Sequence, residues 1–407
     1  MRSRIDVVGG VYREQCRLPT PTDEIWGSGG RAAAVIAGLG ITVTLHSAVT
    51  AATEVVLASL AHTFHFDLAT VSTNETLQFQ YEHALSTPVI YPQRVEHLTI
   101  QFDAENVLAF GMLEAKAIVR AQRVVYDPQN PVAPEPIEFA PDVTPRVAYV
   151  LNSWEARKLG GVDDLAEAAL RITKRFRTAV VVIKRGPRGA LVYENGRSER
   201  IPAYKTDSVW PIGSGDVFAA AFAARWAGED RPAVEAAGDA SRAAALYVNS
   251  RVLPISSDEI KEGGQFDFPP LLMRERMPED KGYDVYLAGP FFNIAQRWLI
   301  EEARSALQGM GLKVFSPLHD IGLGGAHDVA PQDLEGLRKS RAVLALVDGL
   351  DAGTVFEIGY ARSIEKPVVV LAESTAEEAL KMVSGSGCDV VTDFVTSVHR
   401  VAWAARA

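Results

Sequence analysis

Short apolar runs alternate with helical patterns along most of the chain. The apolar runs lie at residues 5–8, 123–127, 147–151, 179–184, 283–288, 342–347 and 367–371. Apolar residues recur at helical spacing in residues 32–40, 154–159, 163–175 and 295–310. Strands that alternate with helices predict a mostly parallel α/β sheet. The pattern is weaker over residues 41–110, where alternating segments at 69–72, 77–81 and 98–102 predict further strands.

One stretch separates two such α/β patterns. Residues 263–282 are rich in glycine, proline and charge, which is typical of a domain boundary. We therefore expect a first domain at residues 1–262, a linker at 263–282 and a second domain at 283–407. The 407 residues are enough for two or three domains that each bury a core.

Composition narrows the class of protein. Hydrophobic residues make up 47% and charged residues 23% of the chain, which is ordinary for a soluble globular protein. A net charge of −10 without a basic block argues against a nucleic acid polymer as partner. No stretch approaches roughly 18 apolar residues, and Cys16 and Cys388 have neither metal nor disulfide spacing. We expect a cytoplasmic protein with no membrane partner.

Two carboxylates, Asp351 and Glu357, follow the apolar run 342–347 and enter a helical pattern. The carboxyl ends of parallel strands hold the ligands of open α/β sheets, so both are candidates for a site. In one interpretation Thr354 and Glu357 form a capping box, and Glu357 only satisfies a backbone donor. In the other, Glu357 lies in the first helical turn, where the helix dipole keeps it ionised as a nucleophile for glycosyl chemistry.

Three segments keep the order and spacing of a known family. They are Tyr286-Leu287-Ala288-Gly289-Pro290-Phe291-Phe292, Asp333, and Asp351-x-Gly353-Thr354-x-x-Glu357-x-Gly359-Tyr360-Ala361. Over roughly residues 283–390 the chain resembles the nucleoside 2-deoxyribosyltransferase family. The resemblance implies that Glu357 attacks the anomeric carbon of a nucleoside and forms a covalent glycosyl-enzyme. Asp351 would hold or protonate the departing base.

The same resemblance implies further site residues. Tyr286 would orient Glu357 and Phe292 would stack on the base or sugar, although both aromatics are equally compatible with a plain core role. Gly289, Asp333 and Gly353 would complete the substrate site, with no cofactor. A neighbouring subunit completes the site in this family, so a homo-oligomer is implied.

This half also departs from the family pattern. Arg341 stands where a second Asp is expected, eight residues after Asp333, and 379–382 lacks the polar residue expected near the sugar 5′ group. Arg341 and Lys381 are candidates for binding a 5′-phosphate, which would favour a nucleotide over a nucleoside. The loop expected at 317–328 contains His319, Asp320, His327 and Asp328. Their spacing matches no standard metal site, so we expect a mobile flap there.

Gly213-Ser214-Gly215-Asp216 begin a strong helical pattern. Backbone amides in such a turn converge on a spot that suits a phosphate or a developing oxyanion. Asp216 is placed either to accept a proton from a hydroxyl or to cap the helix. An earlier glycine loop at 27–30 either lets backbone amides approach a polar ligand or is a structural turn.

Residues 1–255 resemble the PfkB/ribokinase family of sugar and nucleoside kinases. The matching pieces are Gly29-Gly30, Asp127-Pro128, Asn152-x-x-Glu155, Arg185-Gly186-Pro187-Arg188-Gly189 and Gly213-Ser214-Gly215-Asp216. The resemblance implies an anion hole at Gly213, Ser214 and Gly215, with Asp216 as catalytic base. It implies ATP with Mg²⁺ near Glu155 and Asn152, and an acceptor near Gly29 and Gly30.

The acceptor end departs from this family. Trp210-Pro211 replaces the usual Asp-Thr, Glu14 stands in for an early Asp or that Asp is lost, and alanines fill 32–34 where an Asn is expected. Buried sugar hydroxyls need polar partners, so an unusual acceptor is expected.

Together the two resemblances imply an α/β protein with an N-terminal ribokinase-like domain and a C-terminal flavodoxin-like or Rossmann-like parallel domain. The leading hypothesis is an enzyme acting on a small nucleoside or nucleotide. One domain would cleave or exchange an N-glycosidic bond, and the other would use ATP for phosphorylation. In the alternative, the N-terminal half is a non-catalytic nucleotide-binding module that gates a C-terminal nucleotide N-glycosidase. A third hypothesis makes both halves binding modules.

Overall fold

The computed structural model describes residues 3–93, 97–130, 133–261, 266–271, 273–274 and 280–407. The chain divides into two compact units, Met1–Pro270 and Leu271–Ala407. The division falls within the expected linker, residues 263–282, part of which lies outside the described residues.

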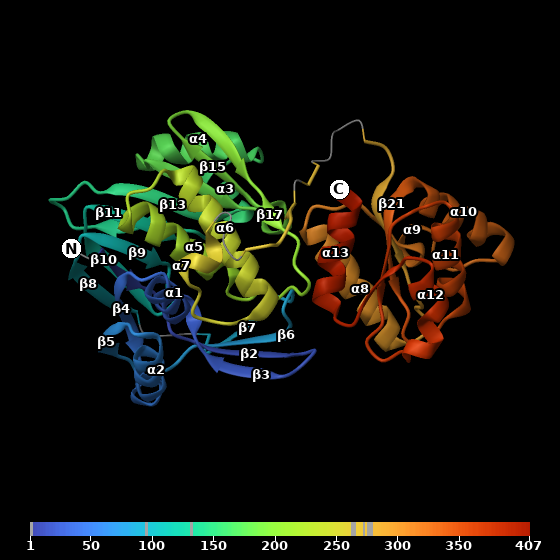
Figure 1. Ribbon diagram of the computed structural model, residues 1–407, viewed down its shortest axis with the longest axis horizontal. Coiled ribbons are helices and arrows are strands. Elements are labelled where there is room, and N and C mark those ends of the chain that lie inside the picture. Colours follow the sequence, from blue (N-terminus) through green and yellow to red (C-terminus); the bar gives the residue numbers. More distant parts are fainter. Residues whose placement is uncertain (1–2, 94–96, 131–132, 262–265, 272, 275–279) are drawn as a thin grey trace. The chain divides into compact units, whose positions relative to one another are not determined.

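A nine-stranded sheet forms the centre of the first unit (Figure 1). Its strand order is β16-β15-β14-β13-β11-β9-β1-β4-β5, and only the pairs β14–β15 and β15–β16 are antiparallel. Most of these strands are buried runs of valine, leucine and alanine, as expected where helices cover both faces of a sheet. The bounds are β1 Arg4–Val8, β4 Thr42–Val49, β5 Asp67–Ser72, β9 Asn106–Phe110, β11 Arg123–Asp127, β13 Arg146–Asn152, β14 Val180–Lys184, β15 Ala190–Glu194 and β16 Arg197–Ile201.

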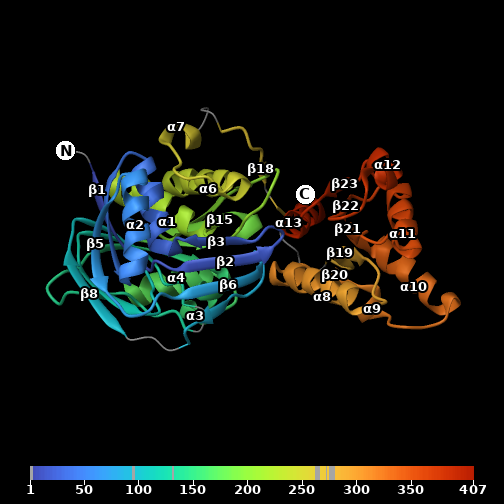
Figure 2. The same cartoon turned by 90° about the horizontal axis from the view of Figure 1, so that it is seen from below.

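Helices cover both faces of this sheet (Figure 2). On one face, α1, α5 and α6 share one hydrophobic cluster, while α3 and α4 contribute Ala156, Ala169 and Ile172 to the cluster on the other face. The bounds are α1 Gly27–Gly38, α2 Ala51–Phe64, α3 Ser153–Gly160, α4 Leu165–Phe176, α5 Ser214–Ala223, α6 Ala233–Ser250 and α7 Ser257–Ile260, with a π-helical turn at Ala224–Gly228 and a 3₁₀ turn at Gly186–Arg188.

Smaller sheets complete the first unit. A four-stranded sheet has the order β3-β2-β6-β7, and a three-stranded sheet has the order β12-β10-β8. The bounds are β2 Arg13–Leu18, β3 Thr22–Ile25, β6 Gln78–His83, β7 Val89–Tyr91, β8 Leu98–Asp103, β10 Ala115–Arg120 and β12 Glu138–Phe139. The short β17 Ala203–Tyr204 pairs with β18 Pro270–Leu271.

The second unit has a five-stranded sheet that is parallel throughout, in the order β20-β19-β21-β22-β23. Counted along the chain, this is the flavodoxin-like order 2-1-3-4-5, which places a ligand crevice between β19 and β21. Helices α8 and α13 lie on one face, and α10, α11 and α12 on the other (Figure 1). The bounds are β19 Tyr283–Ala288, β20 Val314–Phe315, β21 Ser340–Leu346, β22 Val368–Leu371, β23 Asp389–Val391, α8 Ile294–Gly309, α9 Pro317–Asp320, α10 Ala326–Lys339, α11 Ala352–Ser363, α12 Lys381–Gly385 and α13 Phe394–Arg406, with a 3₁₀ turn at Glu377–Leu380.

The α/β architecture expected of both halves is confirmed, and two local predictions are wrong. The segment 317–328 is not one loop, because α9 begins at Pro317 and α10 at Ala326. Proline is favoured in the first helical turn, where its missing N–H is not needed. The glycines at 27–30 form the first turn of α1, not a loop before it. Among the described residues, no helix is long and apolar enough to cross a bilayer.

Candidate active sites

A cavity of about 470 Å³ opens at the carboxyl edge of the nine-stranded sheet. Asp127, Asn152 and Lys184 are the last residues of three adjacent parallel strands, and all three line it. The start of α5 contributes Gly213, Gly215 and Asp216 to the same wall. The carboxyl edge is where open α/β sheets bind ligands. Of the sequence candidates of this half, most line this one cavity, whereas Gly29, Gly30 and Ser214 do not.

Asp216 is buried near the start of α5 and does not cap it. The N-cap is Gly213, whose φ of 82° is left-handed and therefore favours glycine. Both carboxylate oxygens of Asp216 accept hydrogen bonds: Oδ2 from an η-nitrogen of Arg31 at 2.7 Å, and Oδ1 from Nε2 of Gln129 at 2.5 Å. The interpretation of Asp216 as an N-cap is therefore wrong.

Asn152 and Glu155 form a capping box at the start of α3. The Asn152 side chain accepts from the backbone N–H groups of Trp154 and Glu155, and Glu155 Oε2 accepts from the Asn152 N–H at 2.7 Å. Both residues also line the cavity. The capping box thus explains the spacing of Asn152 and Glu155, and the second carboxylate oxygen of Glu155 takes no part in it.

Asp127 and Lys184 form a buried ion pair beside Glu155. Burial raises the pKa of Asp127 to about 7, although the Lys184 cation opposes the shift. Burial also raises the pKa of Glu155. Lys184 lies against the start of α5, since a Cβ on Gly215 would come within 3.4 Å of its Nζ.

These carboxylates fit a magnesium ion that arrives with a nucleotide. Asp127 Oδ1 is buried without a hydrogen-bond partner, and carboxylate oxygens are the hard ligands that Mg²⁺ prefers. Within the described ranges, no three His, Cys, Asp or Glu side chains gather as a metal site. Mg²⁺ commonly takes only one or two carboxylates and completes its shell with phosphate oxygens and water.

Gly29 and Gly30, which were predicted near the acceptor, do not line the cavity. The cavity is lined by Ser28 and Arg31, while a Cβ on Gly29 would meet the Gly9 carbonyl at 2.7 Å. Gly29 therefore serves close packing between α1 and the end of β1. Sequence reasoning missed Arg31 and Lys184, and the signal for Lys184 was a charge at the end of a buried strand.

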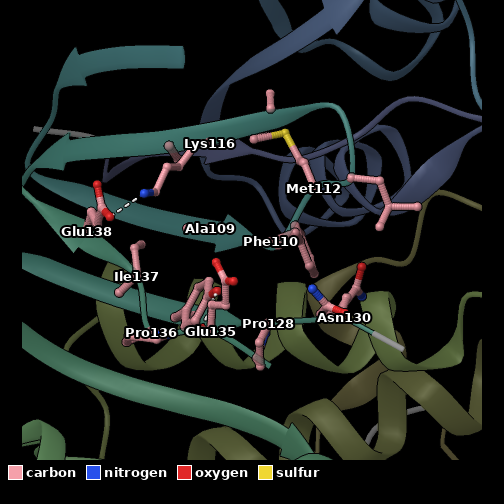
Figure 3. Close-up of a pocket in the computed structure, with 16 residues that line it drawn as sticks. Ala109, Phe110, Met112, Lys116, Pro128, Asn130, Glu135, Pro136, Ile137 and Glu138 are labelled. Atoms are coloured by element: carbon pink, nitrogen blue, oxygen red, sulfur yellow. Dashed lines mark hydrogen bonds and ion pairs between the residues drawn. The ribbon is translucent and has the colours of Figure 1, made fainter. Parts of the chain in front are cut away.

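A second cavity, of about 80 Å³, adjoins the first and shares Gly111, Leu113, Gln129 and Asn130 with it. In Figure 3 its wall runs from Phe110 and Met112 past Pro128 to the ion pair between Lys116 and Glu138. None of the predicted site residues lines it.

In the second unit, Glu357 of α11 lies beside Tyr286 of β19, one of the two strands at the topological switch point of the sheet. The Tyr286 hydroxyl, from β19, donates a hydrogen bond to Glu357 Oε1 at 2.5 Å. Tyr286 is fully buried and its ring stacks on Phe315. The N-cap of α11 is Asp351, whose Oδ2 accepts from the Thr354 N–H at 2.8 Å. The interpretation in which Thr354 caps and Glu357 closes a capping box is therefore wrong.

The expectation that the dipole of α11 keeps Glu357 ionised also needs correction. The first turn of α11 contains no acidic residue, so Glu357, six positions after the N-cap, lies beyond the strongest helix-dipole effect. Burial raises the pKa of Glu357 to about 7, the Tyr286 hydrogen bond lowers it, and Asp333 and Asp351 raise it. Burial also raises the pKa of Asp333 to about 6. Three carboxyl groups thus interact around Glu357.

Arg341 lies away from this cluster. It is the second residue of β21, about 16 Å along the strand from Leu346 at the carboxyl end. Its guanidinium pairs with Asp280 at 3.0 Å. Arg341 therefore does not belong to the crevice, and Lys381 forms an exposed ion pair with Glu378.

The remaining predicted residues surround the crevice. Phe292 follows β19 and is 71% exposed, so its ring is not a core aromatic. A Cβ on Gly289 would meet Ile300 and Leu346 at 3.1 and 3.2 Å, which indicates close packing at the end of β19. Gly353 lies in the first turn of α11, where a Cβ would meet Asp351 Oδ2 at 3.0 Å.

Comparison with known families finds a match in each half of the chain. The model of the nucleoside 2-deoxyribosyltransferase family matches residues 285–390, and that of the pfkB family of carbohydrate kinases matches residues 111–258. The chain is a fusion of these two family domains. The kinase domain contains Asp216 and Lys184, and the transferase domain contains Tyr286 and Glu357.

Individual relatives are similar to the kinase domain. The cytidine kinase of Thermococcus kodakarensis is 37% identical over 86 residues, which are 20% of this chain and 31% of that protein. This chain thus spans less than a third of that relative's length. A nucleoside kinase structure from Methanocaldococcus jannaschii has a TM-score of 0.48 at 15% identity and covers 63% of this chain and 96% of that one. A fructokinase structure from Vibrio cholerae O395 has a TM-score of 0.47 at 15% identity, with 61% and 94% covered.

Proposed function

We propose that the transferase domain cleaves or exchanges the N-glycosidic bond of a nucleoside or nucleotide through a covalent glycosyl-enzyme on Glu357. The hydrogen bond from Tyr286 to Oε1 carries this proposal, because it fixes the carboxylate and leaves Oε2 to attack the anomeric carbon. As the new C–O bond forms, the C–N bond to the base breaks and its electron pair goes to the base nitrogen. Water or a second base then takes the glycosyl group from Glu357.

In this proposal Asp333 supplies the proton to the departing base. Its pKa of about 6 keeps part of the population protonated near neutral pH. Asp351 uses one oxygen on the helix cap and has the other to hold the base. The exposed ring of Phe292 stacks on the base or sugar.

The test of this activity is base release. The full-length chain is incubated with a panel of deoxynucleosides and deoxynucleoside monophosphates, and free base is followed by chromatography. Wild type releases or exchanges base, and Glu357→Ala does so at least about 10²-fold more slowly, because a nucleophile is lost. Equal, negligible rates for both proteins on every substrate would refute the proposal.

We propose further that the kinase domain transfers the γ-phosphoryl group of ATP to a hydroxyl of a nucleoside or related sugar. Asp216 accepts the hydroxyl proton, the acceptor oxygen attacks the γ-phosphorus, and the bond to the bridging oxygen breaks with its electrons staying on ADP. The amides at Gly213–Gly215 and the Lys184 cation stabilise the charge on the transferred group. Asp127 and Glu155 would hold the Mg²⁺ that comes with ATP, and the ion would neutralise charge on the phosphates. The similarity to a cytidine kinase supports a nucleoside acceptor.

One observation favours the alternative in which this domain binds nucleotide without catalysis. Both oxygens of Asp216 already accept one hydrogen bond each, from Arg31 and Gln129, so an acceptor hydroxyl would share the carboxylate with these two partners. ADP formation that requires Mg²⁺ and an acceptor, and that is lost in Asp216→Asn, would exclude the alternative. ATP binding without turnover would favour a gating role.

A further inference from the structure

Arg31 is the most completely enclosed cation in the wall of the kinase cavity. It lies on α1, is 2% exposed, and meets groups from three other elements. One η-nitrogen donates to Asp216 Oδ2 at 2.7 Å, the other donates to Glu14 Oε2 at 2.5 Å, and Nε donates to the Tyr247 hydroxyl at 3.1 Å. These partners come from α5, β2 and α6.

The start of α5 is shaped to let Arg31 pass. A Cβ on Gly213 would come within 2.2 Å of Nε, 2.4 Å of Cζ and 2.6 Å of Cδ of Arg31. Those distances are far below any contact that a real Cβ makes, so only glycine fits at the N-cap while Arg31 holds this position. Gly213 also has the left-handed φ of 82°. Gly213 is therefore needed both to make room for Arg31 and to form the turn at the start of α5.

The charges explain why this arrangement is fixed. A buried guanidinium between two carboxylates is held by charge-assisted bonds, and removing one partner would leave an uncompensated charge. Arg31 holds one oxygen of Asp216, and Gln129 holds the other. Glu14 belongs to the four-stranded sheet, whereas Asp216 belongs to the helical layer on the nine-stranded sheet. One cation thus connects that sheet with the proposed base.

We propose that Arg31 is a positioning residue of the kinase reaction, which orients the Asp216 carboxylate toward the acceptor hydroxyl and makes that orientation depend on Glu14 of the four-stranded sheet. Arg31 takes no proton in the step. This inference rests on the proposed kinase function.

The experiment measures ADP formation by the full-length chain with Mg²⁺, ATP and a panel of nucleosides, for wild type, Arg31→Met, Arg31→Lys, Glu14→Gln and Asp216→Asn. Arg31→Met is expected to lower kcat about 10²-fold, the effect of misplacing a catalytic group by about 1 Å, with the KM for ATP within about threefold of wild type. Arg31→Lys keeps the positive charge but not the forked guanidinium group, so its kcat should be about tenfold higher than that of Arg31→Met. Glu14→Gln weakens the charge-assisted bond that holds Arg31, so it should also lower kcat, by less than Arg31→Met does.

Three results would overturn the inference. The first is an Arg31→Met protein, folded by circular dichroism, whose kcat stays within about threefold of wild type while Asp216→Asn is inactive. If Arg31→Met does not fold, Arg31→Lys decides: a tenfold loss of kcat supports positioning, and a wild-type kcat contradicts it. If wild type and Asp216→Asn form no ADP with any acceptor, the proposed kinase function itself fails, and the inference fails with it.

Discussion

At the residue scale, two effects act on the pKa of Glu357 in opposite directions. Burial favours the neutral form, and one hydrogen bond favours the charged form. Burial raises its pKa to about 7 and Tyr286 opposes that shift. A nucleophile must be ionised and the proposed acid Asp333, whose pKa is raised to about 6, must be protonated, so base release is expected to be greatest between about pH 6 and 7 and to fall on either side. The phenol of Tyr286 keeps its own proton because burial and Glu357 raise its pKa, which leaves it a hydrogen-bond donor throughout.

The variant Tyr286→Phe tests that hydrogen bond. Without the donor, the pKa of Glu357 should rise further, because a hydrogen bond to a charged group contributes about 1.5–3 kcal/mol and about 1.4 kcal/mol corresponds to one pKa unit. Because Asp333 must stay protonated in the same step, a smaller fraction of the protein then has both required charge states, and the maximal rate of base release should fall about tenfold. An unchanged maximal rate, in a folded variant, would contradict the assigned role of Tyr286.

A second prediction concerns stability. Because the pKa of Glu357 is raised from 4.5 to about 7, the folded protein binds this proton more tightly than the unfolded chain. The stabilisation is complete below about pH 4.5 and is lost as the pH rises through about 7. Glu357→Gln stays neutral, so it should melt at a higher temperature than wild type at pH 8, by about 2 °C or more, and show a much smaller difference at pH 5. Calorimetry at both pH values checks this, and an equal difference at both would contradict it.

At the scale of elements, the capping box at the start of α3 has a structural role that can be measured apart from catalysis. Asn152→Ala removes the acceptor for two backbone N–H groups and should cost about 1 kcal/mol of unfolding free energy. Asn152→Ser keeps a capping oxygen and is the matched control, with a loss of a few tenths of that value. Urea unfolding, followed through the transition of the kinase domain, checks both variants. Equal losses would show that the cap is not the cause.

Strands and helices with strong local patterns were predictable, and contacts across the chain were not. Strand β14 is visible in the sequence as a continuous buried apolar run, and helix α4 because its buried residues recur at helical spacing. The segment 317–328 was misjudged because its glycines and proline favour a loop, although proline also fits the first turn of a helix such as α9. Arg31 reaches a partner 185 positions away, and no local pattern reveals such a pair.

The candidate residues of the transferase domain were found for a different reason. Tyr286, Asp333 and Glu357 lie in segments whose order and spacing match the family, and in the structure Tyr286 and Asp333 both interact with Glu357. Arg341 was misassigned because spacing alone does not tell which end of a strand a residue occupies. The raised pKa of Glu357 depends on burial, which cannot be read from the sequence.

At the scale of the whole molecule, the transferase domain exposes large apolar side chains that a second copy of the chain would cover. Ile294 is 87%, Met382 84% and Phe356 62% exposed. We propose a homo-oligomer formed through this domain, as its family resemblance implies, in which a second copy removes the apolar surface of these side chains from water. Ile294→Ser with Phe356→Ser should lower the sedimentation coefficient toward that of a monomer. Val55→Ser on α2, which is 73% exposed, is the control and should change nothing.

The fusion of two nucleoside-related domains suggests a shared intermediate. A nucleoside formed by glycosyl exchange at Glu357 carries the free hydroxyl that the kinase domain would phosphorylate. Tethering two sites on one chain raises the effective concentration of one for the product of the other. This order of steps requires that the transferase domain works through a covalent intermediate that a second base can intercept.

The most direct measurement is therefore the mass of the protein itself during turnover. The full-length chain is mixed with a deoxynucleoside, quenched with acid within seconds, digested and analysed by mass spectrometry. The account predicts a deoxyribosyl adduct on the peptide that contains Glu357, absent from Glu357→Gln and discharged when a second base is added. Base release by wild type with an unmodified Glu357 peptide at every time point would contradict it.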